Sequence, residues 1–154
     1  IMMVDANITS LLSIPYLQYV SDHDPELVIQ SNTRRFVLSK SNPHFHSGTD
    51  PTDGKRNYGV GSPHTPGNRI WHMSIVMQAL ATKENTELKE LLLMLQRTAT
   101  NDLMHESFDV NSPARFTRAS FAWSNSLLAE LIDTRLQDII RVLKPPVEGT
   151  VKAT

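Results

Sequence analysis

The chain has 154 residues, 40% of them hydrophobic and 20% charged, which is the composition of a folded domain with its own core. A formal net charge of −1 offers no basic surface for nucleic acid or an anionic membrane, and no apolar run approaches the roughly 18 residues of a membrane span, so we expect neither as a partner. The absence of cysteine excludes disulfides, thiolate metal sites and a cysteine nucleophile, and leaves the cellular compartment open.

The first forty residues predict two helices. The chain begins at Ile1 and runs directly into sequence of folded character, so we expect it to be part of a larger protein. Apolar residues at helical spacing predict a helix over residues 5–20, with Pro15 as a kink or an early end. An Asp-Pro pair, in which Asp caps and Pro fits the first helical position, predicts a second helix over residues 24–39.

Residues 41–68 predict a long loop. Five of the six glycines fall in this stretch, together with several prolines and three of the six histidines. Long loops within compact domains are usually functional or disordered, and this composition indicates a loop folded over a site. The glycines at 59 and 61 resemble a phosphate-binding loop, but no Lys-Ser or Lys-Thr follows and no strand is predicted before them. We expect them to turn the backbone so that His64 points into a pocket.

The remaining elements are helices. Apolar residues at helical spacing predict helices over residues 69–82, 85–98 and 119–143, and the Pro-Pro pair after Lys144 ends the last of them. Residues 144–154 have neither periodicity nor turn signals and are expected to form a tail. With no strand predicted, the fold class is all-α: helix hairpins whose loops carry the functional residues.

A break between two predicted helices carries the leading candidate for an acid or base. Glu106 lies within Met104–Phe108, among apolar residues that would disfavour a charged carboxylate. In an enzyme acting on sugars, such a carboxylate can activate the attacking water. The structural alternative is a buried glutamate paired with Arg115 or Arg118, which is the more frequent role of such a residue.

The segment that follows has the composition of a carbohydrate-binding wall. Residues 115–123 contain two arginines and three aromatic residues, which bind flat, hydroxyl-rich ligands by stacking and hydrogen bonding. Arg118 is a candidate either for binding a ligand hydroxyl or for fixing Glu106. Trp71 and Trp123 are both candidates for stacking on a sugar, although a Trp with apolar helical neighbours is more often core; Trp123 is closer in sequence to Glu106.

The six histidines raise the question of a metal site. His44 and His46 alternate like paired ligands, and His105 and Glu106 add two donors. No pair of ligands has the helical spacing of a His-Glu-x-x-His site, so we predict neither a metal ligand set nor a cofactor.

Several ordered motifs resemble one family of enzymes. They extend over nearly the whole chain, to about residue 142: Asp5–Asn7, Ser10–Leu17, Asn32–Phe36, Gly61–Thr65, Ile70-Trp71, Met73–Ile75, Met77–Leu80, Met104–Phe108, Phe116–Arg118 and Phe121–Leu127. Together these motifs resemble glycoside hydrolase family 125. One departure is His72, which stands where the family pattern has Pro.

The resemblance implies both a fold and an activity. Members of the family are metal-independent exo-α-1,6-mannosidases that invert configuration and fold as an (α/α)6 barrel. By comparison with the family, whose general-acid motif lies earlier than any part of this chain, residues 1–143 would be the C-terminal portion of that catalytic domain. The barrel would be incomplete, because 154 residues are too few for twelve helices. The partners implied are a mannose-containing oligosaccharide or N-glycan fragment and the missing N-terminal part of the same domain.

The resemblance also implies roles for individual residues. Glu106 would be the general base, and His64, His105, Arg118 and Trp123 would bind the substrate. The general acid would be an aspartate in an earlier motif that this chain does not contain, so the chain alone would be inactive. Two alternatives remain: a non-catalytic helical carbohydrate-binding or interaction module, which would bind sugar without turnover, and a metal-dependent hydrolase, whose activity a chelator would abolish.

Overall fold

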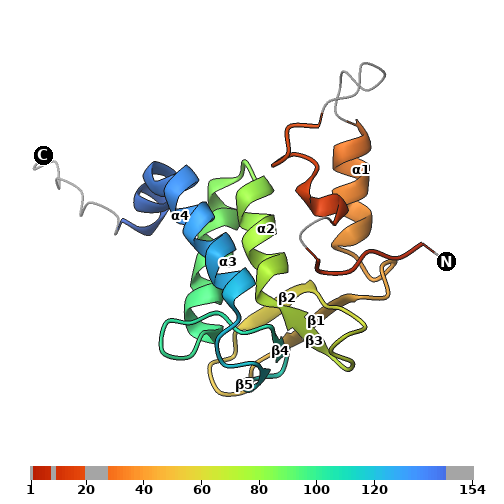
Figure 1. Cartoon of the computed structure of the whole chain (residues 1–154), viewed down its shortest axis with the longest axis vertical. Coiled ribbons are helices and arrows are strands. Elements are labelled where there is room, and N and C mark those ends of the chain that lie inside the picture. The colour runs from red at the N-terminus through yellow and green to blue at the C-terminus, as the bar shows by residue number, and fades with distance from the viewer. Residues whose placement is uncertain (1, 8–9, 20–27, 145–154) are drawn as a thin grey trace, which may run out of the picture.

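The computed structural model describes residues 2–7, 10–19 and 28–144. The helical elements in chain order are η1 (Leu11–Ser13), a 3-10 turn, and the α-helices α1 (Val28–Val37), α2 (His72–Ala81), α3 (Asn85–Thr98) and α4 (Ala122–Leu143). The strands are β1 (Phe45–Thr49), β2 (Arg56–Val60), β3 (Arg69–Trp71), β4 (Ser107–Asp109) and β5 (Ser112–Thr117). Figure 1 shows α2, α3 and α4 packed together above the strands, with α1 on the other side of α2.

The predicted all-α fold class, and with it part of an (α/α)6 barrel, is wrong for this chain. Strands β1 and β2 form one antiparallel sheet, and β3, β4 and β5 form a second, in that order. The second sheet joins residues far apart in sequence, since Arg69 pairs with Asp109 and Trp71 with Ser107. The protein is therefore a mixed structure in which helices stand on two small sheets.

The predicted loop over residues 41–68 contains a β-hairpin. Its turn is built from short-range hydrogen bonds: the Asp50 carboxylate accepts the Thr52 N–H at 2.9 Å, and Asp50 N–H donates to Lys55 O at 2.9 Å. Gly54 adopts a positive φ of 68°, which glycine reaches without steric cost. These local bonds bring β1 and β2 into register, with Phe45 opposite Val60.

The helix predicted over residues 5–20 does not form in the residues described there, apart from the turn η1. Hydrogen bonds to the loops hold the chain before η1 in an extended form: Val4 N–H donates to Asn42 Oδ1 at 3.2 Å and Ala6 N–H donates to Gly61 O at 3.0 Å. These long-range partners tie the segment to residues 42 and 61, and local helical periodicity does not reveal them.

The other predicted helices form with adjusted ends. Helix α3 has the predicted bounds, and α4 begins three residues later than predicted. The first three residues of the helix predicted over 69–82 form β3 instead. Helix α1 lies within the prediction for 24–39, whose start falls outside the described residues. Of the predicted tail, only Lys144 is described, at the end of α4.

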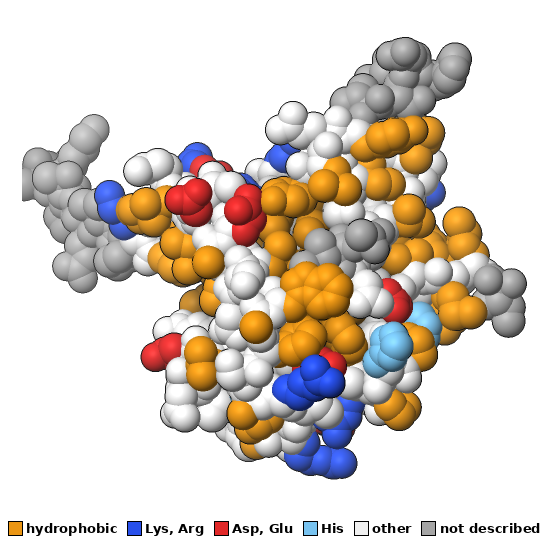
Figure 2. Space-filling view, in the orientation of Figure 1, with side chains coloured by type: hydrophobic (Ala, Val, Ile, Leu, Met, Phe, Trp, Pro, Cys, Tyr) orange, Lys and Arg blue, Asp and Glu red, His pale blue; other side chains and the backbone are white. Residues whose placement is uncertain are grey.

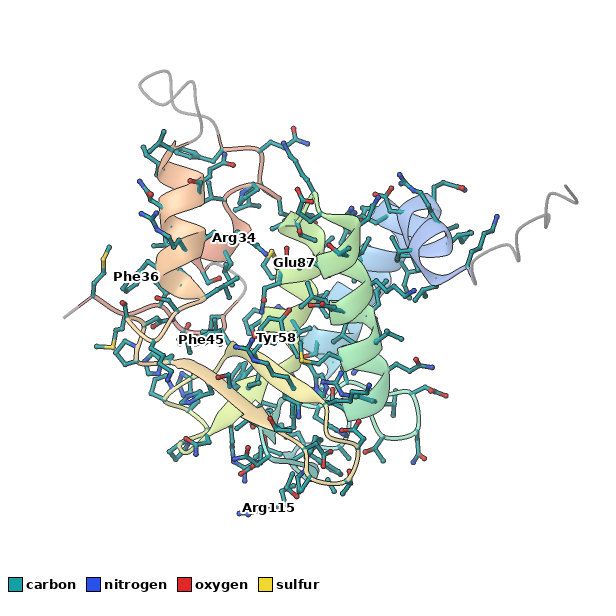
Figure 3. The ribbon with its side chains drawn as sticks, turned by 180° about the vertical axis from the view of Figure 1, so that it is seen from behind. Arg34, Phe36, Phe45, Tyr58, Glu87 and Arg115 are labelled. Carbon is teal, nitrogen blue, oxygen red and sulfur yellow. The ribbon has the colours of Figure 1, made fainter. Side chains whose placement is uncertain are left out.

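The core surrounds α2. Every residue of α2 from His72 to Ala79 is buried, including Met73, Ile75 and Val76 with no exposed surface. Leu88 and Leu91 of α3 and Leu131 of α4 close around it. On the face opposite to that in Figure 1, Arg34 of α1 points toward Glu87 of α3 and forms an ion pair with it (Figure 3). None of the helices in the described ranges is long and apolar enough to span a membrane.

Helix α4 supplies a cap to α2. The Arg135 guanidinium donates from Nη1 to Ala79 O at 2.6 Å and to Thr82 O at 2.7 Å, so it satisfies carbonyls at the C-terminal end of α2. Its Nη2 also binds Asp138 at 2.9 Å. Arg135 departs from helical geometry (φ −124°, ψ 22°), so the kink in α4 occurs where this cap is made.

Replacing Arg135 with Met is expected to lower the free energy of unfolding by about 2–3 kcal/mol, because two carbonyls lose a charged donor. Arg141→Met is a matched control, since Arg141 also pairs with Asp138 but its side chain is 60% exposed; it should cost under about 1 kcal/mol. Denaturant unfolding of both variants measures the difference. Equal losses would show that the contacts with α2 contribute nothing.

Candidate functional site

Glu106 lies immediately before β4, at the end of the three-stranded sheet. Its backbone N–H donates to Thr117 O at 3.2 Å, which fixes the peptide against the end of β5. Its side chain is 12% exposed, and Arg118 Nε lies 3.5 Å from its Oε2. The carboxylate is thus mostly sheltered but still reaches the surface, and it has a single cationic neighbour among the described ion pairs.

Arg118 occupies an unusual backbone conformation. Its φ of 47° is in the left-handed region, which costs a residue with a Cβ atom of order 1 kcal/mol. The guanidinium lies 5.6 Å from the centroid of the Phe121 ring, a cation–π distance, and two-thirds of the side chain is exposed. A strained backbone therefore places one exposed cation between a sheltered carboxylate and an aromatic ring.

Aromatic side chains form a continuous row beside this pair. Phe121 meets Trp71 edge to face at 6.0 Å, and it lies 6.4 Å from Trp123 on its other side. The row ends at His64, whose ring is 6.4 Å from Trp71. Trp71 is buried and donates from Nε1 to Thr65 Oγ1 at 2.6 Å, whereas Trp123 is 49% exposed. We call these four rings the aromatic row.

The structure brings together four of the five predicted site residues. Glu106, Arg118, His64 and Trp123 all lie on or beside the aromatic row. Figure 2 displays a face on which hydrophobic side chains border Lys or Arg and His side chains, the same mixture of types. The sequence favoured a core position for Trp71, which is indeed buried. Phe121 was not among the predicted site residues, although its ring contacts Arg118 and both tryptophans.

His105, the fifth predicted residue, lies behind the site. Its ring has no exposed surface and stacks on Phe116 at 3.8 Å with the two planes 4° apart. One ring nitrogen, Nδ1, lies 2.8 Å from Ala119 O, and the other, Nε2, lies 3.1 Å from Thr100 Oγ1. Both nitrogens therefore have partners within the chain, and the buried ring is not available to a ligand.

The structure also tests the proposed pairings. Glu106 pairs with Arg118, as the structural alternative allowed, and Arg115 is instead exposed, with its carbonyl accepting from Arg69 Nη1 at 3.3 Å. Across the described ranges there is no group of three His, Asp or Glu side chains that could hold a metal ion. His44 and His46 are half-buried on either side of the start of β1 and belong to no such group.

Comparison with known proteins places this geometry in a family. The sequence profile of the metal-independent alpha-mannosidases, glycoside hydrolase family 125, matches residues 1–133. The chain is 44% identical over 144 residues to the meiotically up-regulated gene 157 protein of Schizosaccharomyces pombe, a match that covers 92% of this chain and 26% of that protein.

A solved structure gives the same relationship. It is a metal-independent alpha-mannosidase of Streptococcus pneumoniae in a non-productive complex with alpha-1,6-mannobiose, 37% identical to this chain with a TM-score of 0.75. The match covers 88% of this chain and 30% of the other, so the chain spans under a third of the length of these relatives. The family resemblance seen in the sequence motifs is confirmed: the chain belongs to glycoside hydrolase family 125, the metal-independent alpha-mannosidases.

Proposed function

We propose that these 154 residues are part of an enzyme that removes terminal, non-reducing α-1,6-linked mannose by an inverting, metal-independent mechanism. The observation that carries the proposal is Glu106, a sheltered carboxylate 3.5 Å from an exposed guanidinium and next to a row of aromatic rings. The related enzyme from Streptococcus pneumoniae was solved with alpha-1,6-mannobiose, which supports this choice of linkage. The substrate class is a mannose-containing oligosaccharide or an N-glycan fragment.

Glu106 acts as the general base in this proposal. It takes a proton from water as the water attacks the anomeric carbon on the face opposite the leaving oxygen. A base for this step must be accessible to water. The 12% exposure of the Glu106 side chain leaves an edge for the water, and Arg118 Nε, 3.5 Å from Oε2, orients the carboxylate.

The substrate-binding residues have different tasks. The exposed face of Trp123 stacks on a sugar ring, and Arg118 donates hydrogen bonds from the guanidinium nitrogens that Glu106 does not engage. His64, exposed at the far end of the aromatic row, binds a hydroxyl. His105 contributes by holding the peptide before Glu106, because its own ring has no exposed surface.

We further propose that residues 1–143 are a portion of a larger catalytic domain and that the general acid lies outside the chain. Inversion needs an acid and a base about 6.5–9.5 Å apart, with room for water between them. The match to under a third of each relative supports this arrangement. So does an apolar stripe on α4 that is between 40% and 46% exposed, a surface that a larger domain would bury: Ile132, Leu136, Ile140 and Leu143.

The test is hydrolysis of α-1,6-mannobiose by the full-length enzyme, followed by proton NMR of the first product. We expect β-mannose before mutarotation, and a rate unchanged by EDTA. The isolated 154-residue chain is the matched control and should release no mannose. Appearance of α-mannose would contradict inversion, loss of activity with EDTA would favour a metal-dependent hydrolase, and binding without turnover would favour a non-catalytic module.

A further inference from the structure

Two imidazoles are buried directly behind Glu106. His72 is the first residue of α2, His105 precedes Glu106, and neither has exposed surface. Their ring centroids are 5.3 Å apart, and the His72 ring is 4.7 Å from that of Phe108. A buried polar ring is costly unless its nitrogens are hydrogen-bonded, so the partners of His72 define what it does.

The hydrogen-bond network assigns the proton of His72. The Thr98 hydroxyl donates to Met94 O at 2.7 Å, so its oxygen is left to accept from His72 Nε2–H at 2.9 Å. Nδ1 then carries a lone pair, and the His105 backbone N–H donates to it at 3.0 Å. The other tautomer would direct Nδ1–H at His105 O, 3.2 Å away, and would remove the acceptor of the His105 N–H.

Residues 104–106 precede β4 and lie outside the strand pairing, which begins at Ser107. Their backbone N–H groups therefore depend on acceptors other than the β3–β4 ladder. Each backbone N–H of this segment has a partner on a different element. Met104 N–H donates to Asn125 Oδ1 of α4 at 3.1 Å, His105 N–H to the His72 ring of α2, and Glu106 N–H to Thr117 O of β5. The His72 contact is the middle one and immediately precedes Glu106.

We propose that His72 is a positioning residue for Glu106: its buried Nδ1 accepts the His105 N–H and so fixes the peptide from which the Glu106 side chain projects. This inference rests on the proposed role of Glu106 as the base. The ring is well suited to the task, because burial, and then the neighbouring His105, lower the pKa of His72 to about 3. The lone pair on Nδ1 is therefore present throughout the neutral range.

Three substitutions of His72 in the full-length enzyme separate positioning from packing. Asn places its amide oxygen near the position of Nδ1 and keeps the acceptor. Gln is closer to His in volume but places its polar end near Nε2, and Leu has no acceptor. Gln78→Leu is the control, because Gln78 is also buried on α2 and neither end of its amide has a partner among the described residues.

The first measurement is kcat and KM on α-1,6-mannobiose. We expect His72→Gln and His72→Leu to lower kcat by about 10- to 100-fold with little change in KM, the size of effect that a misplaced catalytic group gives. His72→Asn and Gln78→Leu should remain close to the wild type. If His72→Gln retained activity and His72→Asn lost it, packing volume would be the determinant and the proposal would fail.

The second measurement is hydrogen exchange of the His105 amide, which needs no turnover. His72→Gln and His72→Leu should speed its exchange at least about tenfold, whereas His72→Asn should preserve protection. Unchanged protection in His72→Leu would overturn the positioning role. An inactive wild-type enzyme would contradict the proposed function instead. Hydrogen exchange would then still test whether His72 Nδ1 accepts the His105 N–H.

Discussion

Glu106→Gln is expected to lower kcat by about 10²- to 10⁴-fold while leaving the affinity for a mannose-based inhibitor nearly unchanged. The amide keeps the shape of the carboxylate but cannot take a proton from water. Turnover, inhibitor affinity and thermal unfolding are measured on the same preparation of the full-length enzyme. The matched control is Glu90→Gln, an exposed residue of α3, which should behave as the wild type.

The structure also limits what Glu106→Gln can do to stability. The partner of Glu106 is Arg118, whose side chain is 66% exposed, so water already screens the pair. We therefore expect little change in the melting temperature. Near-normal turnover per folded molecule would exclude Glu106 as the base, and a large loss of stability with normal turnover would make the pair structural.

Acid is expected to destabilise the protein through His72. The folded-state pKa of about 3 lies below the ordinary value of 6.5, so the unfolded state takes up this proton first as the pH falls. Above about pH 6.5, His72 does not change the free energy of unfolding. As the pH falls, keeping this ring neutral in the folded state lowers the free energy of unfolding by about 2 kcal/mol at pH 5, and by nearly 4 kcal/mol at about pH 3.

Denaturant unfolding of the wild type and of His72→Asn at pH 7.5 and pH 5 measures this cost. The variant lacks the imidazole at position 72, so the difference between the two pH dependences reports His72 together with its interaction with His105. We expect the wild type to lose about 2 kcal/mol more than the variant. Parallel pH dependences would mean that His72 does not have to be neutral in the folded protein.

The sequence predicted best what depends on local periodicity. Helix α3 is fourteen residues long, its leucines at 88, 91, 92 and 95 repeat at helical spacing, and the predicted bounds match those in the structure. The strands are three to six residues long, too short for a period of two to be distinguished from part of a helical pattern. Ile70 and Trp71 illustrate this. Both are apolar and buried in β3, and the same two residues also fit the apolar pattern of the helix predicted over residues 69–82.

The candidate site was predictable as a set of segments but not as a geometry. Glu106 and Arg118 are close in sequence, and the motifs that carry the family resemblance contain them both. Which side chains face outward depends on the pairing of β3 with β4, and no local pattern contains that pairing. For this reason His105 was predicted to face the ligand, although its ring is buried, and the connecting position of Phe121 was not recognised.

The pairing of β3 with β4 also determines when the site can assemble. Trp71 and Ser107 lie opposite each other in the two strands but are 36 residues apart in sequence, and α2 and α3 lie between them. Closing that loop directly in the unfolded chain is entropically unfavourable, whereas two helices joined by a short connection form from local contacts. Once α2 and α3 pack against each other, β3 and β4 are delivered to the same end of the hairpin. We therefore expect Glu106 to reach its final position late in folding.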